Sequence, residues 1–326
     1  MLLFSNPNRP AGQLVAASPP PKPVKLRPLL AFSPSHFPFP LPEKHRFPVS
    51  KYQLLRERLL TAGWTVCDAT TADWDDVAQV HSAEYLLQLQ QSTLDTKAVR
   101  ELGFPWSDEL LIRSLASVGG TVQAAQAALR TKFAANLAGG THHAFADRGE
   151  GFCVLNDVAI AAKKLHDLGE AQNIAVVDLD VHQGNGTAHI AADWRWLTTI
   201  SVHGARNYPF RKQVSDLDVP LPDQIAGSAY LETLQENVFP FLENLQPDFI
   251  FLNAGADVLQ GDRYGRLLLS ADEIAERDRL VAEFCFRHDV PMVWVMGGGY
   301  HPSIEKTVDA HLKSLQAIAA IFNIIT

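Results

Sequence analysis

Cysteine is scarce in this sequence. Only three cysteines, Cys67, Cys153 and Cys285, occur among 326 residues, and they lie far apart. An odd number at such spacing fits neither a disulfide framework nor a zinc site built from Cys-x-x-Cys pairs. The sequence also lacks an apolar run of roughly 18 residues that could span a membrane, and it lacks the pattern of a secretory signal. We therefore expect a cytoplasmic protein with no membrane partner.

Basic side chains are also few. The chain has 28 Lys and Arg against 36 Asp and Glu, a formal net charge of −8. A nucleic-acid-binding protein would carry a basic face, so direct nucleic-acid binding is not expected. With 47% apolar residues the chain can bury a large core. Histidine, present 12 times, is the residue type that we follow toward a chemical function.

The first 28 residues differ in composition from the rest. They hold seven prolines and no acidic residue, which is typical of a flexible or polyproline-like leader. The lack of acidic residues leaves organellar targeting as an alternative, but Ser and Arg are too sparse for a typical transit peptide. We predict a leader over 1–28 and one folded catalytic domain over 29–326.

From residue 29 onward, apolar runs of strand length alternate with helical patterns. Runs such as IAVVDLD and FIFLNAG are apolar throughout, as expected for parallel strands covered on both faces. The predicted strands are Leu29–Phe32, Trp64–Cys67, Ala134–Ala138, Ile174–Asp178, Thr198–Val202, Phe249–Asn253 and Val293–Met296. Helices are predicted over 50–61, 82–91, 155–168, 227–243, 271–288 and 303–322, and an apolar stripe from Leu111 to Leu129 predicts another. This order predicts a single open, doubly wound α/β sheet, mainly parallel, with helices on both faces.

Polar or glycine-rich clusters follow five of the apolar runs. In an open parallel sheet, ligands bind outside the carboxyl ends of the strands, so these clusters should converge on one site. The clusters are Gly139–Ala144, Asp178–Thr187, Ser201–Gly204, Ala254–Asp257 and Gly297–Tyr300.

Asp180 and His182 form a candidate metal pair at a strand exit, because residues two apart can point the same way. Asp257, in the loop after FIFLN, is the best candidate for a third ligand. Three protein ligands with one open position are typical of a catalytic zinc site. Since two of the three ligands are carboxylates, Fe²⁺ or Mn²⁺ could substitute for Zn²⁺.

The adjacent pair His142 and His143 is the second constellation. It follows two glycines and belongs to the same set of strand-end clusters. One of these histidines can act as general base toward water and as general acid toward a leaving amine. Such a histidine needs an oxygen acceptor on its other nitrogen, which Asp178 or Asn185 could supply.

Three aromatic residues complete the candidate site. Tyr300, after three glycines, could donate a hydrogen bond to an oxyanion opposite the metal, although a packed tyrosine at a helix start is the plainer interpretation. Phe152 and Tyr208 could form the walls of a narrow channel for an alkyl stem, or belong to the core.

Taken together, GGTHHA, GFCVLND, DLDVHQGNGT, NAGAD and GGGY, in this order, resemble the motifs of the histone deacetylase family of zinc amidohydrolases. LPEKHRFP (41–48), GFPWS (103–107) and HQGNG are most similar to class IV deacetylases and their bacterial relatives. The resemblance implies the arginase-deacetylase fold and hydrolysis of an N-acyl amine.

The resemblance also implies a role for individual residues. The zinc ligands would be Asp180, His182 and Asp257, and the catalytic residues would be His142, His143, Tyr300, Asp178 and Asn185. The substrate channel would contain Phe152, Tyr208, Gly151, Gly298 and Arg46. A structural K⁺ would be held near Asp178, Asp180, His182, Ser201 and Val202. One departure is that Asn185 stands where better-known classes have Asp, so His143 should be less basic.

The leaving group stays open at this stage. The substrate would be an acylated lysine peptide or a related small amine, with an acetyl or another acyl group. Deacetylation of an acetylpolyamine is the main alternative. A two-metal ureohydrolase and a catalytically silent acyl-lysine reader are less favoured. The sequence predicts neither the acyl length nor the oligomeric state.

Overall fold

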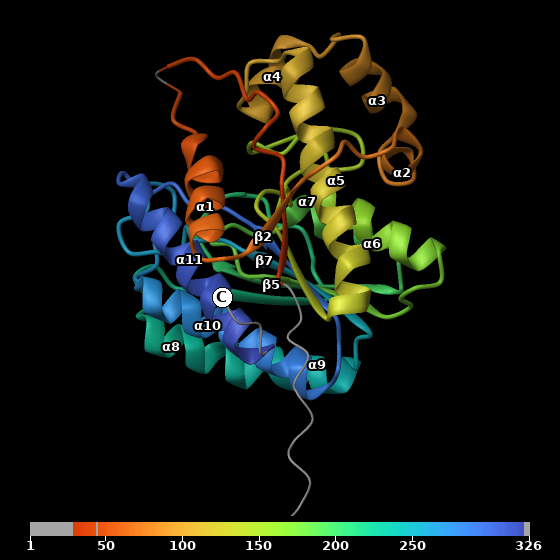
Figure 1. Ribbon diagram of the computed structural model, residues 1–326. Helices are drawn as coiled ribbons and strands as arrows, with labels where there is room; N and C mark the ends of the chain where they lie inside the picture. Colours follow the sequence, from red (N-terminus) through yellow and green to blue (C-terminus); the bar gives the residue numbers. More distant parts are fainter. Residues whose placement is uncertain (1–28, 44, 323–326) are drawn as a thin grey trace, which may run out of the picture.

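A computed structural model describes residues 29–43 and 45–322 of the chain. Its centre is an eight-stranded sheet with the order β2-β1-β3-β8-β7-β4-β5-β6 (Figure 1). Every pair of neighbouring strands is parallel, so the sheet is wholly and not mainly parallel. The strands are β1 (Leu30–Ser33), β2 (Thr65–Asp68), β3 (Phe133–Asn136), β4 (Ile174–Asp178), β5 (Leu197–Gly204), β6 (Leu217–Leu221), β7 (Phe249–Ala254) and β8 (Met292–Met296).

Helices cover both faces of this sheet, as the alternation in the sequence predicted (Figure 1). Parallel neighbours must be joined by crossovers, which places a helix over one face or the other. The helices are α1 (Ser50–Thr61), α2 (Trp74–Ala78), α3 (Ala83–Gln90), α4 (Thr96–Leu102), α5 (Asp108–Thr131), α6 (Asp157–Asp167), α7 (Asn185–Ala191), α8 (Gly227–Thr233), α9 (Phe239–Leu245), α10 (Ala271–Arg287) and α11 (Ile304–Ile321), with a π-helical turn, η1 (Leu234–Val238), between α8 and α9.

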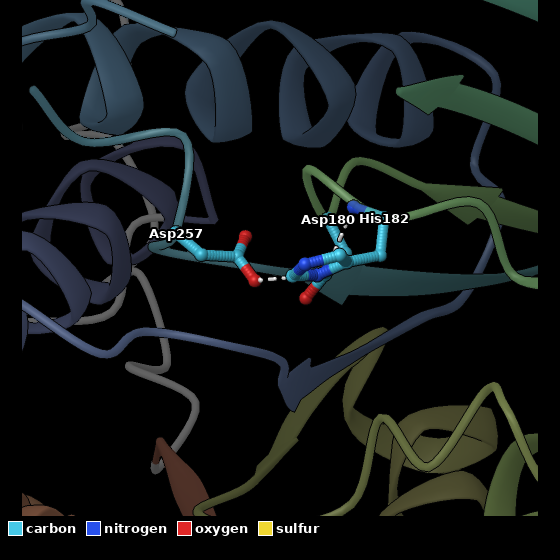
Figure 2. Close-up of side chains that lie close together, drawn as sticks. All are labelled: Asp180, His182 and Asp257. Carbon is cyan, nitrogen blue, oxygen red and sulfur yellow. Dashed lines mark hydrogen bonds and ion pairs between the residues drawn. The ribbon is translucent and has the colours of Figure 1, made fainter. Parts of the chain in front are cut away.

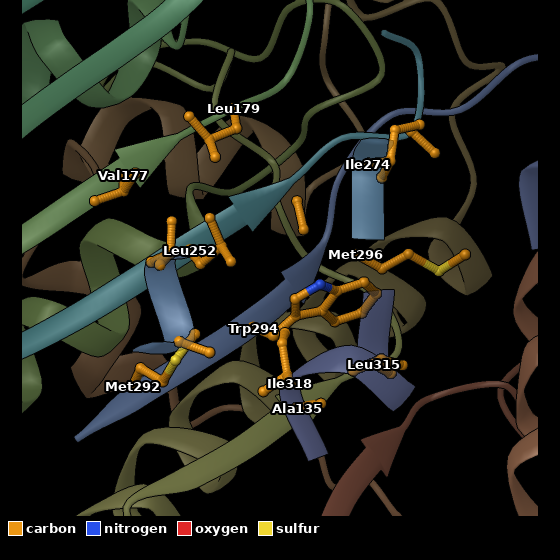
Figure 3. Close-up of a cluster of buried hydrophobic side chains, with 14 of the residues drawn as sticks. Ala135, Val177, Leu179, Leu252, Ile274, Met292, Trp294, Met296, Leu315 and Ile318 are labelled. Carbon is orange, nitrogen blue, oxygen red and sulfur yellow. The ribbon is translucent and has the colours of Figure 1, made fainter. Parts of the chain in front are cut away.

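Alternate residues of the central strands point to opposite faces of the sheet and belong to two separate hydrophobic cores. In β8, Trp294 packs with α1, α10 and α11 on one face, whereas Val293 and Val295 pack with α5 and α6 on the other. Figure 3 shows Trp294 beside Leu315 and Ile318 of α11. All five residues of β8 are buried, because a strand covered on both faces must be apolar on both. This double burial explains the uninterrupted apolar runs in the sequence.

Helix α5 confirms the predicted apolar stripe and adds a close approach to the sheet. Its Leu111, Leu115, Val118 and Val122 are buried. A Cβ atom at Gly120 would lie 2.7 Å from Oδ1 of Asn136, which ends β3. Glycine at this position therefore lets the helix pack directly against the strand exit that leads to the tandem histidines.

Several predicted boundaries differ from the structure. The strand predicted over Ala134–Ala138 is β3, and it ends at Asn136. The helix predicted over 227–243 is interrupted by η1 just before Pro240, which cannot donate a helical hydrogen bond. The sequence prediction missed α2, α4, β6 and α7. Short, polar or proline-containing segments such as these carry too little periodicity to reveal an element.

The predicted leader, 1–28, lies outside the described residues. In the part of the chain that the structure describes, no helix has both the length and the apolar character needed to span a membrane.

Candidate active site

Side chains from four of the five predicted clusters meet at the carboxyl edge of the sheet. Gly139–Ala144 follows β3, Asp178–Thr187 leaves β4, Ala254–Asp257 leaves β7, and Gly297–Tyr300 follows β8. The fifth cluster, Ser201–Gly204, lies inside β5. It lines neither of the two pockets to which His182 contributes. Because β3, β8, β7 and β4 are consecutive in the sheet, their exits are neighbours although they are far apart in the sequence.

Asp180, His182 and Asp257 converge on one point, as predicted (Figure 2). One candidate ligand atom from each lies within 4.8 Å of the others. His182 Nδ1 is 2.9 Å from Oδ1 of Asp180 and 3.2 Å from Oδ2 of Asp257. It is the only such cluster of histidine, cysteine or carboxylate ligands among residues 29–43 and 45–322.

The chemistry of this cluster fits a divalent cation. Burial, and then the neighbouring charge of Asp180, raises the pKa of the Asp257 carboxyl to about 7. Two buried carboxylates this close cannot both ionise readily without a cation between them. Apart from its 3.2 Å contact with Nδ1 of His182, Oδ2 of Asp257 has no polar partner among the described residues, which leaves a lone pair for a metal. Two oxygen atoms and one imidazole nitrogen suit Zn²⁺, Fe²⁺ or Mn²⁺.

The backbone around the cluster positions the two carboxylates. Val181 N donates to Oδ1 of Asp257 at 2.9 Å, and Gly298 N donates to Oδ2 of Asp180 at 2.7 Å. A Cβ atom at Gly298 would lie 1.9 Å from Oδ2 of Asp257. Gly298, which also lines the pocket, is therefore needed for the carboxylates to fit.

The first tandem histidine is held by a carboxylate. His142 Nδ1 lies 2.6 Å from Oδ2 of Asp178, and both side chains are buried. Burial alone lowers the pKa of His142, but the charges of Asp178 and Asp180 outweigh it and raise the pKa to about 9. His142 is therefore a cation at neutral pH.

The second tandem histidine is held by an amide. His143 Nδ1 donates to Oδ1 of Asn185 at 2.6 Å. Burial, and then the positive charges of His142 and His182, lower the pKa of His143 well below its usual value. The hydrogen bond fixes the tautomer so that Nε2 carries a lone pair. His143 is therefore the neutral base of the pair.

Tyr300 lines both the pocket that contains Asp180 and His182 and the opening next to it. Its backbone N–H donates to Oδ2 of Asp262 at 2.6 Å. This hydrogen bond holds the backbone from which the tyrosine ring projects. Its hydroxyl makes no hydrogen bond to any described residue. Burial, and then the charges of Asp180 and Asp257, raise the pKa of Tyr300 well above its usual value, so the phenol stays protonated and can donate.

An aromatic channel of about 260 Å³ leads to these groups. Phe152 and Tyr208 form part of its walls, together with Tyr264, which the sequence analysis missed. A Cβ atom at Gly151 would lie 2.7 Å from Cδ2 of His143, and Gly151 has φ of +54°, so glycine is required there. The full lining is His143, Gly151, Phe152, His182, Tyr208, Tyr264 and Tyr300.

The prediction for Arg46 was wrong. Arg46 is exposed and lines neither the channel nor the buried pocket, because its neighbours His45 and Phe47 are turned inward. His45 Nε2 contacts Gly103 O, and the ring of Phe47 packs against Phe152.

Two other basic side chains, Lys51 and Arg113, are buried near the site. Lys51 is 1% exposed, donates to Gly297 O at 3.2 Å and lines the pocket beside the metal ligands. Arg113, from α5, lines an adjoining cavity beneath Phe39 and Tyr52. Lys51 could have been found, since it precedes the buried Leu55 and Leu59 at helical spacing.

The predicted potassium ligands lie close together because β4 and β5 are neighbouring strands. Asp178 of β4 pairs with Ser201 of β5 in the sheet, which brings Ser201 and Val202 beside the segment from Asp178 to His182. A potassium site in this position stays a prediction.

A parallel sheet with a candidate metal cluster at the carboxyl ends of its strands fits the arginase-deacetylase superfamily, to which the matching family model belongs. The model of the histone deacetylase domain matches residues 43–315, and the chain belongs to the histone deacetylase family. An uncharacterised protein of Picosynechococcus is 42% identical over 276 residues, covering 83% of this chain and 92% of its own length.

One further relative and one solved structure are similar to this chain. A probable deacetylase of Archaeoglobus fulgidus is 31% identical over 246 residues, covering 70% of this chain and 67% of its own length. The crystal structure of an acetylpolyamine aminohydrolase from Burkholderia pseudomallei shares the fold, with a TM-score of 0.77 and 22% identity over 90% of this chain and 99% of that chain. The chain is thus placed among hydrolytic deacetylases, without a particular substrate or class.

Proposed function

We propose that this protein is a metal-dependent deacetylase that releases an acetyl or related acyl group from the amine of a lysine side chain or a small amine. The observation that carries this proposal is the pair His142 and His143 beside the cluster of Asp180, His182 and Asp257. The charges of Asp178 and Asp180 keep His142 protonated, whereas burial and the charges of His142 and His182 keep His143 neutral, with Asn185 orienting its ring. The neutral His143 can accept a proton, and the charged His142 beside it can stabilise negative charge that develops on the substrate.

Asp180, His182 and Asp257 would hold the metal, with Zn²⁺ as the first choice and Fe²⁺ or Mn²⁺ as substitutes. When bound, such a metal lowers the pKa of water and polarises a carbonyl group. The three ligands account for one ion. The two-metal ureohydrolase alternative is disfavoured, since Gln183 and Asn185 stand near the ligands where further carboxylates would be needed.

The remaining steps belong to side chains of this chain. Neutral His143 takes a proton from the attacking water, and its hydrogen bond to Asn185 keeps Nε2 available for that proton. The Tyr300 hydroxyl donates to the oxygen atom on which negative charge develops. The charged His142 stabilises the same negative charge. The proton held by His143 then passes to the departing amine.

The channel supports an acyl amine with a slender stem. Phe152 and Tyr208 face the same opening, and their rings can enclose an alkyl chain that ends at the metal cluster. Both a lysine side chain and a polyamine have such a stem, so acetylpolyamine deacetylation remains the second candidate.

The test is hydrolysis by purified protein whose metal content is measured. Acetyl-lysine peptides, longer acyl-lysine peptides and acetylpolyamines are compared, with chelator and after addition of Zn²⁺, Fe²⁺ or Mn²⁺. We expect activity that chelation removes and one divalent ion restores. Two tight ions per chain would favour a ureohydrolase. Inactivity of the metal-loaded protein on every substrate would favour an acyl-lysine reader.

We also propose that K⁺ binds near Asp178, Asp180, His182, Ser201 and Val202. Thermal unfolding in KCl and in NaCl at equal ionic strength tests this site. A higher unfolding temperature in KCl is expected, and equal temperatures would remove the site.

A further inference from the structure

Arg277 of α10 is fully buried beneath the metal cluster, 0% exposed, although arginine is rarely buried. Its Nη1 atom donates to two backbone carbonyl groups, Leu179 O at 2.9 Å and Gly255 O at 2.8 Å. Leu179 immediately precedes Asp180, and Gly255 lies two residues before Asp257. One guanidinium thus joins the two strand exits that carry all three metal-ligand candidates.

These two exits are in direct contact. A Cβ atom at Gly255 would lie 2.6 Å from Cα of Asp180 and 2.8 Å from Oδ1 of Asp257. Small changes in the separation of the exits would therefore move one carboxylate relative to the other. The two hydrogen bonds of Arg277 Nη1 span these exits.

A second set of contacts holds Arg277 itself. Its Nε atom donates to Oδ1 of Asp278 at 2.7 Å, and Asp278 is also fully buried. The other oxygen of Asp278 accepts from Ser314 of α11 and from Nε1 of Trp294 in β8, the latter at 3.4 Å. A buried ion pair is costly unless its remaining donors and acceptors are used. Here Nε and Nη1 of Arg277 and both oxygens of Asp278 are used, whereas Nη2 of Arg277 has no hydrogen-bond partner among the described residues. The contacts that are made connect α10 to the exits of β4 and β7, to β8 and to α11.

We propose that Arg277, oriented by Asp278, is a positioning residue that holds Asp180 and Asp257 at the separation required for metal binding. This inference rests on the proposed metal dependence. Within residues 29–43 and 45–322, Arg277 makes no hydrogen bond or ion pair with a ligand side chain, so it would act through the carbonyl groups of Leu179 and Gly255. A change at Arg277 should therefore alter the metal site more than the rest of the fold.

The experiment measures Zn²⁺ affinity by chelator competition for the full chain and for Arg277→Lys and Arg277→Met. Loss of a group that orients a metal ligand typically weakens metal binding by about 10–100-fold. We expect a loss of this size in Arg277→Met. Arg277→Lys keeps the charge but lacks the planar guanidinium, so we expect a smaller loss. The Lys variant also serves if the Met variant does not fold.

Arg279→Met is the matched control. Arg279 lies on the same helix, but its contacts are with Glu276 and Glu283 on the surface. Its Zn²⁺ affinity should equal that of the wild type. A positioning role also predicts an altered visible spectrum of the Co²⁺-loaded Arg277 variants, which a purely structural role would leave unchanged.

The possible failures can be told apart. If the wild type binds no divalent ion, the proposed function fails. If the wild type binds Zn²⁺ and Arg277→Lys binds it equally well with the same Co²⁺ spectrum, only the inference about Arg277 is overturned. Equal loss of thermal stability with and without metal, at unchanged Zn²⁺ affinity, would likewise show a purely structural role.

Discussion

His143 Nδ1 lies 2.6 Å from an amide oxygen, Oδ1 of Asn185, in a site where the neighbouring His142 contacts the carboxylate of Asp178 at the same distance. Asn185 is the first residue of α7, and it is 2% exposed. An amide oxygen orients an imidazole but brings no negative charge that would offset the effect of burial on its pKa. The two adjacent histidines therefore differ in charge: the carboxylates of Asp178 and Asp180 raise the pKa of His142, whereas burial and the charges of His142 and His182 lower the pKa of His143.

Asn185→Asp should raise the pKa of His143, because the new carboxylate stabilises the imidazolium form. Protonated His143 cannot act as a base, so the activity of the variant should fall at a higher pH as the solution is acidified. The measurement is the pH dependence of kcat/KM for both proteins at equal metal content. An acidic limb at the same pH in both would remove His143 as the base.

Tyr300→Phe should lower kcat by roughly 10²–10³-fold, the usual effect of losing one donor to a developing oxyanion. Metal content should not change, since the hydroxyl is not a ligand. Tyr85→Phe is the control, because its hydroxyl donates to Val154 O away from the metal cluster. Full turnover in Tyr300→Phe would exclude this tyrosine from the mechanism.

Lys51→Met should lower kcat, since Lys51 donates to Gly297 O and its ammonium lies 5.4 Å from the centre of the Tyr300 ring. A hydrogen bond from a charged group contributes about 1.5–3 kcal/mol to stability, so without it the segment from Gly297 to Tyr300 should be held less firmly. Burial lowers the pKa of Lys51 to about 8. Wild-type activity should therefore decline as the pH rises through about 8, and Lys51→Met should lack that decline. An identical alkaline limb in both proteins would contradict this role.

His81 should make the folded protein sensitive to acid. Burial lowers the pKa of His81 to about 4, and its Nε2 atom accepts a hydrogen bond from Asn156 N at 3.0 Å. Below pH 6.5 the unfolded chain binds a proton at this position and the folded chain does not, so this contribution to stability is complete above pH 6.5 and is lost toward pH 4.

The loss amounts to at most about 1.4 kcal/mol per pH unit for one group. Urea unfolding at pH 7 and pH 5 measures it, with His81→Gln as the comparison, because glutamine can still accept the Asn156 hydrogen bond. The variant should be less destabilised by the change to pH 5. Equal changes in both proteins would show that His81 does not couple to folding.

The parts of the fold that could be predicted are those with strong local periodicity. The apolar runs of β4, β7 and β8 and the stripe of α5 depend on burial, which selects residue types directly. By contrast, β6 contains Pro220 and lies at the edge of the described sheet, where it pairs with a neighbouring strand on one side only. Helix α7 begins with Asn-Gly, so its helical conformation follows from packing at the site and not from propensity.

By itself, the sequence determined which chemical groups are available and that they follow buried parallel strands, because strand exits and residue types are local properties. It therefore pointed to Asp180, His182, Asp257 and the two histidines. Only the tertiary structure decided which basic side chains are buried. Arg46 faces solvent while Lys51 and Arg277 lie inside, because the direction of a side chain depends on how distant segments pack against its backbone.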